Sequence, residues 1–199
     1  MNVGEILYFA PDLPFSDVDL GGPQLPVQLR QRIQGFYIEP ASRCYGEGHA
    51  FAAGVILVSC IDALGRLSRN RDKVTKEDFI AFVTEHLHGF REETLSERLY
   101  FDVRCGLVHE ARLKNGAQFT LESDTHIDER TGILIVNPQE LASEVESALD
   151  TYVEDLDSDD TKREALADRL CKEYEKDFIA AGHPAFIGTD QGDGSELSI

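Results

Sequence analysis

The segment "AFAAGVILVSCIDALGRL", residues 50–67, is the longest apolar run of the 199-residue chain and decides its fold class. A helix that crosses a bilayer needs about twenty predominantly apolar residues. This run is shorter, and Ser59, Asp62 and Arg66 interrupt it. We therefore predict a helix buried in the core of a mainly α-helical domain, without membrane contact. The N-terminal residues lack the basic start and cleavage site of a signal peptide, so we expect a cytoplasmic protein.

Further helices are expected on both sides of this segment. The first should run from Leu25 to Tyr37 and end before Pro40, and the glycine-containing loop "RCYGEGH", residues 43–49, should follow it. Three later helices should begin at capping boxes, in which a threonine and an acid three positions later satisfy free backbone N–H groups. These pairs are Thr75 with Asp78, Thr94 with Glu97, and Thr161 with Glu164.

The apolar pattern changes to a period of two between the second and the third of these expected helices. Asn115–Gly116 is a strong signal for a two-residue hairpin turn. Ala117, Phe119 and Leu121 then alternate with polar residues, and residues 132–136 read "GILIV". We predict a small antiparallel β-hairpin or meander over residues 110–136.

Two acidic helices should complete the domain over residues 138–179. Asn137–Pro138 is typical of a helix start, because proline fits the first helical position. Residues 1–23 are rich in proline, glycine and aspartate and are expected to form an irregular arm. Residues 182–199 have almost nothing to bury and should form a disordered acidic tail. We therefore expect the remaining residues, 24–181, to form a single domain.

The formal charge of −18 is unevenly distributed. Residues 1–136 hold 14 Lys and Arg against 20 Asp and Glu, whereas residues 137–199 hold 5 against 17. Because phosphate contacts supply most of the affinity for nucleic acid, this balance argues against a general nucleic-acid binder. The acidic helices are either a solvated face or a surface for a basic protein partner, and mimicry of nucleic acid is a third reading.

The cysteines and histidines do not predict a metal site or a bound cofactor. Cys44, Cys60, Cys105 and Cys171 form no CxxC pair and lack histidines at zinc spacing, so free thiols are expected. His86 and His88 are two positions apart on one expected helix and cannot face the same side. His126 and His183 have no evident partner.

A second segment, "RLYFDVRCGLVHEARLKNG" at residues 98–116, carries the chemistry. Its Arg104 and His109 suit work on RNA without a metal. An arginine holds a phosphate in a planar fork and stabilises charge that builds on its oxygens. A histidine has a pKa near working pH, so it can take the proton of the 2′-OH or protonate the leaving oxygen.

This spacing alone is weak evidence, because chance predicts roughly one such pair in a chain with this many arginines and histidines. Arg43 and His49 are spaced similarly, and we interpret them as surface loop residues. The structural alternative makes His109 a helix-end histidine and Arg104 the partner of Asp62 or Glu110 in a salt bridge. Asp62 needs such a partner, because a lone buried acid is costly.

The segment "LYFDVRCGLVHEARLKNG", with the preceding "FAAGVILVSCIDAL", resembles the HEPN superfamily of bacterial helical-bundle proteins. The motif of that superfamily is an arginine, four to six residues, then a histidine near the start of a late helix. The resemblance covers roughly residues 25–115. It implies a helical bundle that forms a homodimer, so that two motifs meet in one cleft. Many members are metal-independent endoribonucleases, and others are noncatalytic binding or assembly modules.

The resemblance makes Arg104 the phosphate-binding arginine and His109 the general acid or base, with Asp62, Cys105 and Glu110 in supporting positions. It predicts cleavage of single-stranded RNA to a 2′,3′-cyclic phosphate, in a setting of stress or phage defence that only the family suggests. The alternative is a noncatalytic dimerisation module whose acidic C-terminal helices bind a protein partner. Active members often carry a polar residue, commonly asparagine, where this chain has Cys105, a weak hydrogen-bonding group.

Helix geometry adds a condition to this prediction. Five residues of ideal helix rotate by about 500°, so Arg104 and His109 should point about 140° apart. They converge only if the helix ends or distorts near Gly106, or if two subunits build the cleft.

Overall fold

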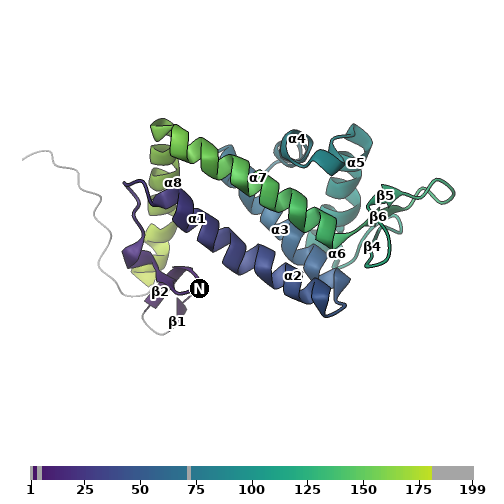
Figure 1. Cartoon of the computed structure of the whole chain (residues 1–199), viewed down its shortest axis with the longest axis horizontal. Coiled ribbons are helices and arrows are strands. Elements are labelled where there is room, and N and C mark those ends of the chain that lie inside the picture. Colours follow the sequence, from purple (N-terminus) through teal and green to yellow (C-terminus); the bar gives the residue numbers. More distant parts are fainter. Residues whose placement is uncertain (1, 4–5, 71–72, 181–199) are drawn as a thin grey trace, which may run out of the picture.

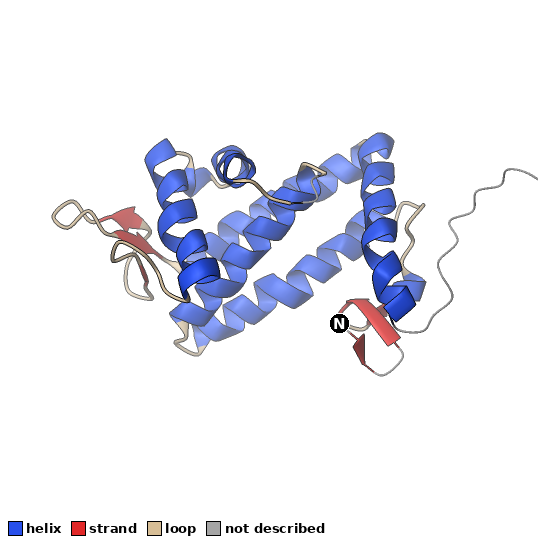
Figure 2. Cartoon of the chain, turned by 180° about the vertical axis from the view of Figure 1, so that it is seen from behind, coloured by secondary structure: helices blue, strands red, loops and turns tan. Residues whose placement is uncertain are grey.

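The computed structural model describes residues 2–3, 6–70 and 73–180 (Figure 1). The expected disordered tail, residues 182–199, lies outside the described residues. Within them the chain is mainly helical, as predicted, and it has two small sheets. Seen from behind, these sheets lie at opposite ends of the helices (Figure 2).

The first helical segment is longer than predicted. α1 (Leu25–Ile33) continues through a π-helical turn (Gln34–Ile38) into α2 (Glu39–Gly46). The expected end before Pro40 is therefore wrong. In the π turn the N–H of Glu39 bonds to the carbonyl of Gln34, five residues back. Pro40 follows at the first turn of α2, where its missing N–H is tolerated.

α3 (Ala50–Ser68) is the buried central helix that the apolar run predicts. It packs against α2, α4 and α7. By length and composition it would also suffice to cross a membrane, yet half of its most apolar stretch is buried inside the molecule. Its core face contributes Leu57, Ile61 and Leu64, none of them more than 1% exposed.

The next helical segment combines α4 (Lys76–His86), a 3-10 turn (His88–Phe90), α5 (Glu93–Arg98), a π-helical turn (Leu99–Arg104) and α6 (Cys105–Glu110). The predicted capping box of Thr75 and Asp78 is confirmed at the start of α4. The box predicted at Thr94 is wrong, because α5 begins two residues earlier, after Glu92, without a side-chain cap.

The second sheet differs from the predicted antiparallel meander. It consists of β4 (Gln118–Phe119), β5 (His126–Ile127) and β6 (Leu134–Val136) in the order β4-β6-β5. β4 runs parallel to β6, and only β5 is antiparallel to it. Asn115 and Gly116 do adopt positive φ values of 49° and 74°. However, they connect the end of α6 to β4 and do not join two strands.

The expected irregular N-terminal arm is instead a small antiparallel sheet. β1 (Asn2–Val3), β2 (Ile6–Ala10) and β3 (Leu13–Pro14) precede a 3-10 turn (Phe15–Asp17). Phe9 and Phe15 are buried, and the ring of Phe15 stacks on Tyr174 with centroids 4.3 Å apart. This contact with a residue far along the chain orders a segment whose composition resembles a loop.

Two long helices end the described chain, as predicted. α7 (Pro138–Ser158) has Asn137 as its N-cap, whose side chain accepts a hydrogen bond from the Gln139 N–H at 2.9 Å. α7 lies along α1 and α3 (Figure 1). α8 (Asp160–Ala180) starts differently from the prediction, because Asp159 accepts from the N–H groups of Thr161 and Lys162. The capping box predicted at Thr161 is therefore wrong.

Candidate functional site

The helix from α5 to α6 carries the predicted motif and runs without a break from Glu93 to Glu110. Its π turn shows in the bond from the Cys105 N–H to the carbonyl of Tyr100, five residues back. Leu99, Val103 and Gly106 face the core. The opposite side carries Phe101, Arg104, Cys105 and Val108, which are partly or fully exposed.

Arg104 forms an ion pair with Asp62, which was one of the two partners expected from the sequence. Its Nε donates to Oδ2 of Asp62 at 3.0 Å and to Oδ1 at 3.3 Å. The two side chains remain 18% and 24% exposed. Burial raises the pKa of Asp62, and the Arg104 guanidinium opposes this rise. Burial disfavours the charge of Arg104, but Asp62 overcomes this effect and the arginine's pKa is raised.

Two neighbours complete the surroundings of this ion pair. The guanidinium carbon of Arg104 lies 5.7 Å from the ring centroid of Tyr100. Burial and a hydrogen bond with Cys105 raise the pKa of Tyr100. Cys105 therefore lies within the cluster, next to the predicted arginine, as a partner of a phenol.

His109 lies in the last turn of α6 and is exposed. The helix neither ends nor distorts at Gly106, so Arg104 and His109 keep the divergence of about 140° expected for five helical residues. Among the described residues, no hydrogen bond or ion pair joins the two side chains. Of the two conditions for convergence, only the second remains, which is a cleft built from two subunits.

Glu110, the other alternative partner of Arg104, is engaged elsewhere. Its carboxylate pairs with Arg112 at 2.5 Å and with Lys114 at 2.7 Å. These contacts lower the pKa of Glu110, with the hydrogen bond from Lys114 as the largest cause. Glu110 thus stabilises the turn that follows α6.

Gly106 has a packing function that the sequence analysis misassigned. A Cβ at this position would lie 2.3 Å from the carbonyl oxygen of Arg112. The N–H of Arg112 bonds back to the carbonyl of Gly106, and Ala111 takes a left-handed conformation with a φ of 53°. The chain therefore folds back directly onto α6, which only glycine permits.

Asp102 is the residue of this region that the sequence analysis missed. It is 1% exposed, pairs with Nε of Arg98 and accepts a hydrogen bond from Nδ2 of Asn115 at 2.6 Å. Its carbonyl accepts from the N–H of Lys114. An acid inside the apolar run from Leu99 to Val103 was the available signal, because a buried carboxylate needs partners.

A hollow of about 380 Å³ lies beside Arg104. Arg104, Arg66 and Lys73 line it together with Asp62, Ala63 and Val74. Arg66 also pairs with Glu173 of α8. The hollow therefore presents more cationic than anionic side chains and suits a phosphate group, although His109 does not line it.

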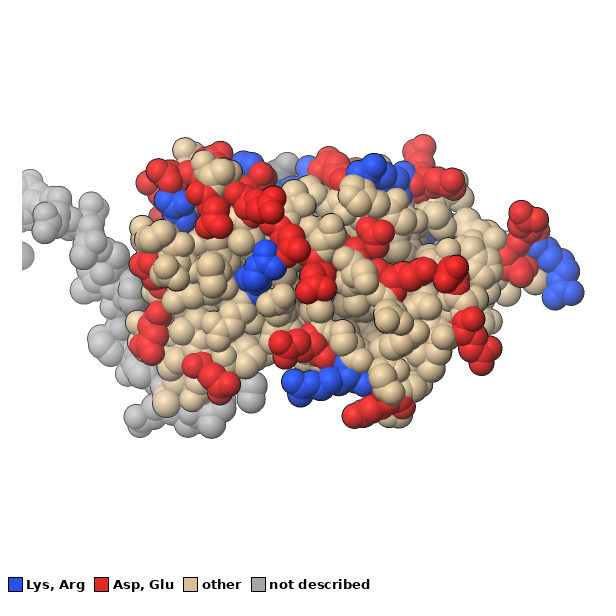
Figure 3. Space-filling model, viewed as in Figure 1, with Lys and Arg blue, Asp and Glu red and all other residues tan. Residues whose placement is uncertain are grey.

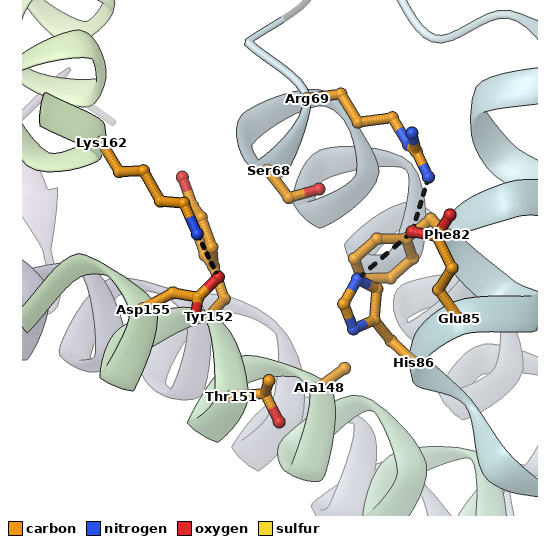
Figure 4. Close-up of a pocket in the computed structure, with 10 residues that line it drawn as sticks. All are labelled: Ser68, Arg69, Phe82, Glu85, His86, Ala148, Thr151, Tyr152, Asp155 and Lys162. Atoms are coloured by element: carbon orange, nitrogen blue, oxygen red, sulfur yellow. Dashed lines mark hydrogen bonds and ion pairs between the residues drawn. The ribbon is translucent and has the colours of Figure 1, made fainter. Parts of the chain in front are cut away.

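A second, smaller hollow of about 140 Å³ lies between α4, α7 and α8 (Figure 4). Glu85 pairs with Arg69 at 2.7 Å on one side, and Asp155 pairs with Lys162 at 2.7 Å on the other. His86 points into the space between them, and burial lowers its pKa. The charged side chains of this second hollow form ion pairs on each side, so the hollow lacks the cationic surplus of the first.

The remaining histidines and Arg43 do not join either hollow. Arg43 is exposed and lies 3.5 Å from Glu39, while His49 precedes α3 as its N-cap residue. His88 is exposed, and the ring of His126 contacts the carbonyl of Asp124. His183 lies outside the described residues. In the part of the chain that the structure describes, no group of three His, Cys, Asp or Glu could hold a metal ion.

On the face that Figure 3 shows, Asp and Glu outnumber Lys and Arg, and α7 contributes acidic but not basic side chains. Several of these acids have intramolecular partners. Asp150 pairs with Arg30, and Glu144 accepts hydrogen bonds from the N–H groups of His88 and Gly89. Part of this acidity therefore holds helices together.

Within one chain, the predicted site residues fall into two separate groups. Asp62, Tyr100, Arg104 and Cys105 form one cluster, and His109 and Glu110 lie apart from it at the end of α6. Comparison with known proteins finds no matching family model, no matching curated protein and no matching solved structure.

Proposed function

We propose that this protein is a metal-independent, HEPN-type endoribonuclease that works as a homodimer on single-stranded RNA. The observation that carries the proposal is the ion pair of Asp62 with Arg104 beside a hollow lined by further cations. The proposed reaction is attack of the 2′-OH on the adjacent phosphate, which leaves a 2′,3′-cyclic phosphate.

The geometry of the ion pair suits phosphate binding. Both contacts of Asp62 use Nε of Arg104, and within the described residues no hydrogen bond uses the two terminal nitrogens. Asp62 therefore orients the guanidinium and leaves its two-pronged end for the oxygens of a phosphate. There the positive charge would stabilise the negative charge that grows in the transition state.

His109 is the proposed general acid or base, and in this proposal it acts in the cleft of the partner subunit. His109 is exposed, and an imidazole can move a proton to or from an oxygen. Val108, beside it, is 58% exposed, and Phe51 at the start of α3 is 51% exposed. Large exposed apolar residues of this kind suit an interface between two copies.

The test is RNA cleavage in EDTA by Arg104→Ala, His109→Ala and a 1:1 mixture of the two, after exchange of subunits. Each variant alone should be inactive. In the mixture, half of the dimers contain both variants, and each of these has one intact Arg104–His109 pair across the interface. We therefore expect about a quarter of the wild-type activity, with cyclic-phosphate ends.

His88→Ala is the matched control, because His88 is an exposed histidine outside the proposed site. It should cleave as the wild type does. Absence of cleavage by a folded, dimeric wild-type protein would refute the proposed reaction. Activity of the single variants without any gain on mixing would refute the shared cleft.

A noncatalytic module that binds a basic protein through α7 is the second candidate. The excess of Asp and Glu along α7 favours it (Figure 3). Glu154 and Asp157 are exposed there, and no ion pair among the described residues engages them. This function would leave the protein unable to cleave RNA, and partner binding would weaken as salt rises.

A further inference from the structure

Phe101 is an aromatic side chain that packing has left in solvent. It lies on the outward side of the π turn, one turn before Arg104, and is 44% exposed. Its ring meets that of Tyr100 edge to face, with centroids 5.3 Å apart. The ammonium group of Lys76 lies 4.6 Å from its centroid. These two contacts fix the ring while part of its surface remains open.

A hollow of about 510 Å³ adjoins this ring. Its lining includes Arg98, Arg112 and Lys114 with the buried Asp102. Asp102 is matched by Arg98, whereas Arg112 and Lys114 share the single carboxylate of Glu110. Lys76 pairs with Glu97 at 3.9 Å, so these ion pairs leave a surplus of one positive charge around Phe101, although the whole chain has a formal charge of −18.

The ring also lies near the hollow beside Arg104. Lys76, which contacts the ring, follows Lys73 and Val74, and both of these line that hollow. Cations thus occur on both sides of the exposed aromatic ring. Proteins that bind single-stranded nucleic acid combine these two elements, because bases stack on aromatic rings while cations follow the phosphates.

We propose that Phe101 is a base-stacking platform for single-stranded RNA, and that Lys76, Arg112 and Lys114 hold the neighbouring phosphates. This inference rests on the proposed function, since it names the element that binds the same substrate. It assigns to Phe101 the base one or two nucleotides away from the phosphate that Arg104 holds. Sequence preference would be weak, because every base has a π face.

The experiment measures binding of a fluorescent oligonucleotide with 2′-O-methyl groups, which cannot be cleaved by 2′-OH attack. Phe101→Leu keeps an apolar side chain but removes the π system, and Phe101→Tyr keeps it. We expect about tenfold weaker binding for Phe101→Leu and nearly wild-type binding for Phe101→Tyr. Lys114→Gln should reduce the dependence of affinity on salt. Val27→Ala, which trims an exposed apolar residue of α1 outside the proposed site, is the control.

Three results would overturn the platform. Equal binding by Phe101→Leu and the wild type would do so, as would absence of binding by the wild type. Dissociation of Phe101→Leu into monomers in sedimentation would make Phe101 a contact between copies instead. Failure of the two proposals is distinguishable, because Phe101-dependent binding without RNA cleavage keeps the platform and removes the nuclease. Cleavage with unchanged binding by Phe101→Leu removes the platform alone.

Discussion

At the scale of single residues, Asp62 and Arg104 show what a sequence can specify. An acid on a buried helix must find a cation, and Arg104 of the motif helix supplies it. That pairing was therefore predictable. The separation of Arg104 from His109 was predictable only as a condition, because it depended on whether the helix continued past Gly106. Close contact between Gly106 and the carbonyl of Arg112 decides this, and no local pattern encodes that contact.

His86 gives a prediction about pH. Burial lowers its pKa in the folded state below the ordinary value of 6.5, and Glu85 only partly opposes this. The unfolded chain therefore binds more protons in this range, so the contribution of His86 to stability is complete above pH 6.5 and is lost as pH falls. We expect His86→Gln to lose less unfolding free energy than the wild type between about pH 7.5 and pH 5.

Urea unfolding at both pH values measures this difference. His49→Gln is the control, because His49 is exposed and is not among the groups that shift the pKa of His86. An equal loss for His86→Gln and the wild type would mean that other groups cause the whole pH dependence.

At the scale of elements, α6 and the chain that folds back onto it depend on one glycine. Gly106→Ala would place a methyl group 2.3 Å from a backbone oxygen, so backbone must move. We expect a loss of about 2 kcal/mol or more in unfolding free energy, as for other overpacked sites.

Gly65→Ala is the matched control within α3. Its new methyl group would meet Phe82 at 3.5 Å, an ordinary contact. Alanine also favours a helix over glycine by about 1 kcal/mol, so this variant should be as stable as the wild type or more stable. Urea unfolding of both variants checks the pair. A small loss of unfolding free energy for Gly106→Ala would contradict the close packing of the Arg112 carbonyl against Gly106.

Elements with strong local signals were predictable, and those set by distant contacts were not. The apolar run of α3, the capping box of α4 and Asn137–Pro138 before α7 each identify their own helix. The N-terminal sheet was not predictable, because Phe9 and Phe15 are ordered by Tyr174 of α8. The parallel pairing of β4 with β6 was also hidden, since a period of two does not reveal strand direction.

At the scale of the whole molecule, charge is separated. Asp and Glu outnumber Lys and Arg on the face that contains α7 (Figure 3). The cations beside Phe101 and Arg104 belong to the motif helix and its neighbours. The total charge predicted repulsion of nucleic acid, but not the local surplus. The six residues that line the hollow beside Arg104 come from α3, from the segment between α3 and α4, and from the π turn, so only the fold brings those cations together.

The proposed dimer predicts a difference between two exposed valines. Val108 lies beside His109 and is 58% exposed, whereas Val27 lies on another helix, α1, and is 54% exposed. Val108→Asp should place a charge in the interface, give monomers in sedimentation and abolish cleavage. Val27→Asp should remain a dimer and stay active. Dimers of Val108→Asp at the wild-type affinity would place the interface elsewhere.

The π turn at Leu99–Arg104 has a consequence for recognising relatives of this protein. Such a turn holds one residue more than an α-helical turn, so it offsets the helix before it from the helix after it. A relative with an uninterrupted α-helix would need a one-residue gap inside the helix, where alignments rarely place one. Without that gap, the alignment is wrong by one residue on one side of the π turn, so it matches either Asp102 or Arg104 to a residue about 100° around the helix from the equivalent position. A sequence search for relatives should therefore align the segment before Leu99 and the segment after Arg104 separately.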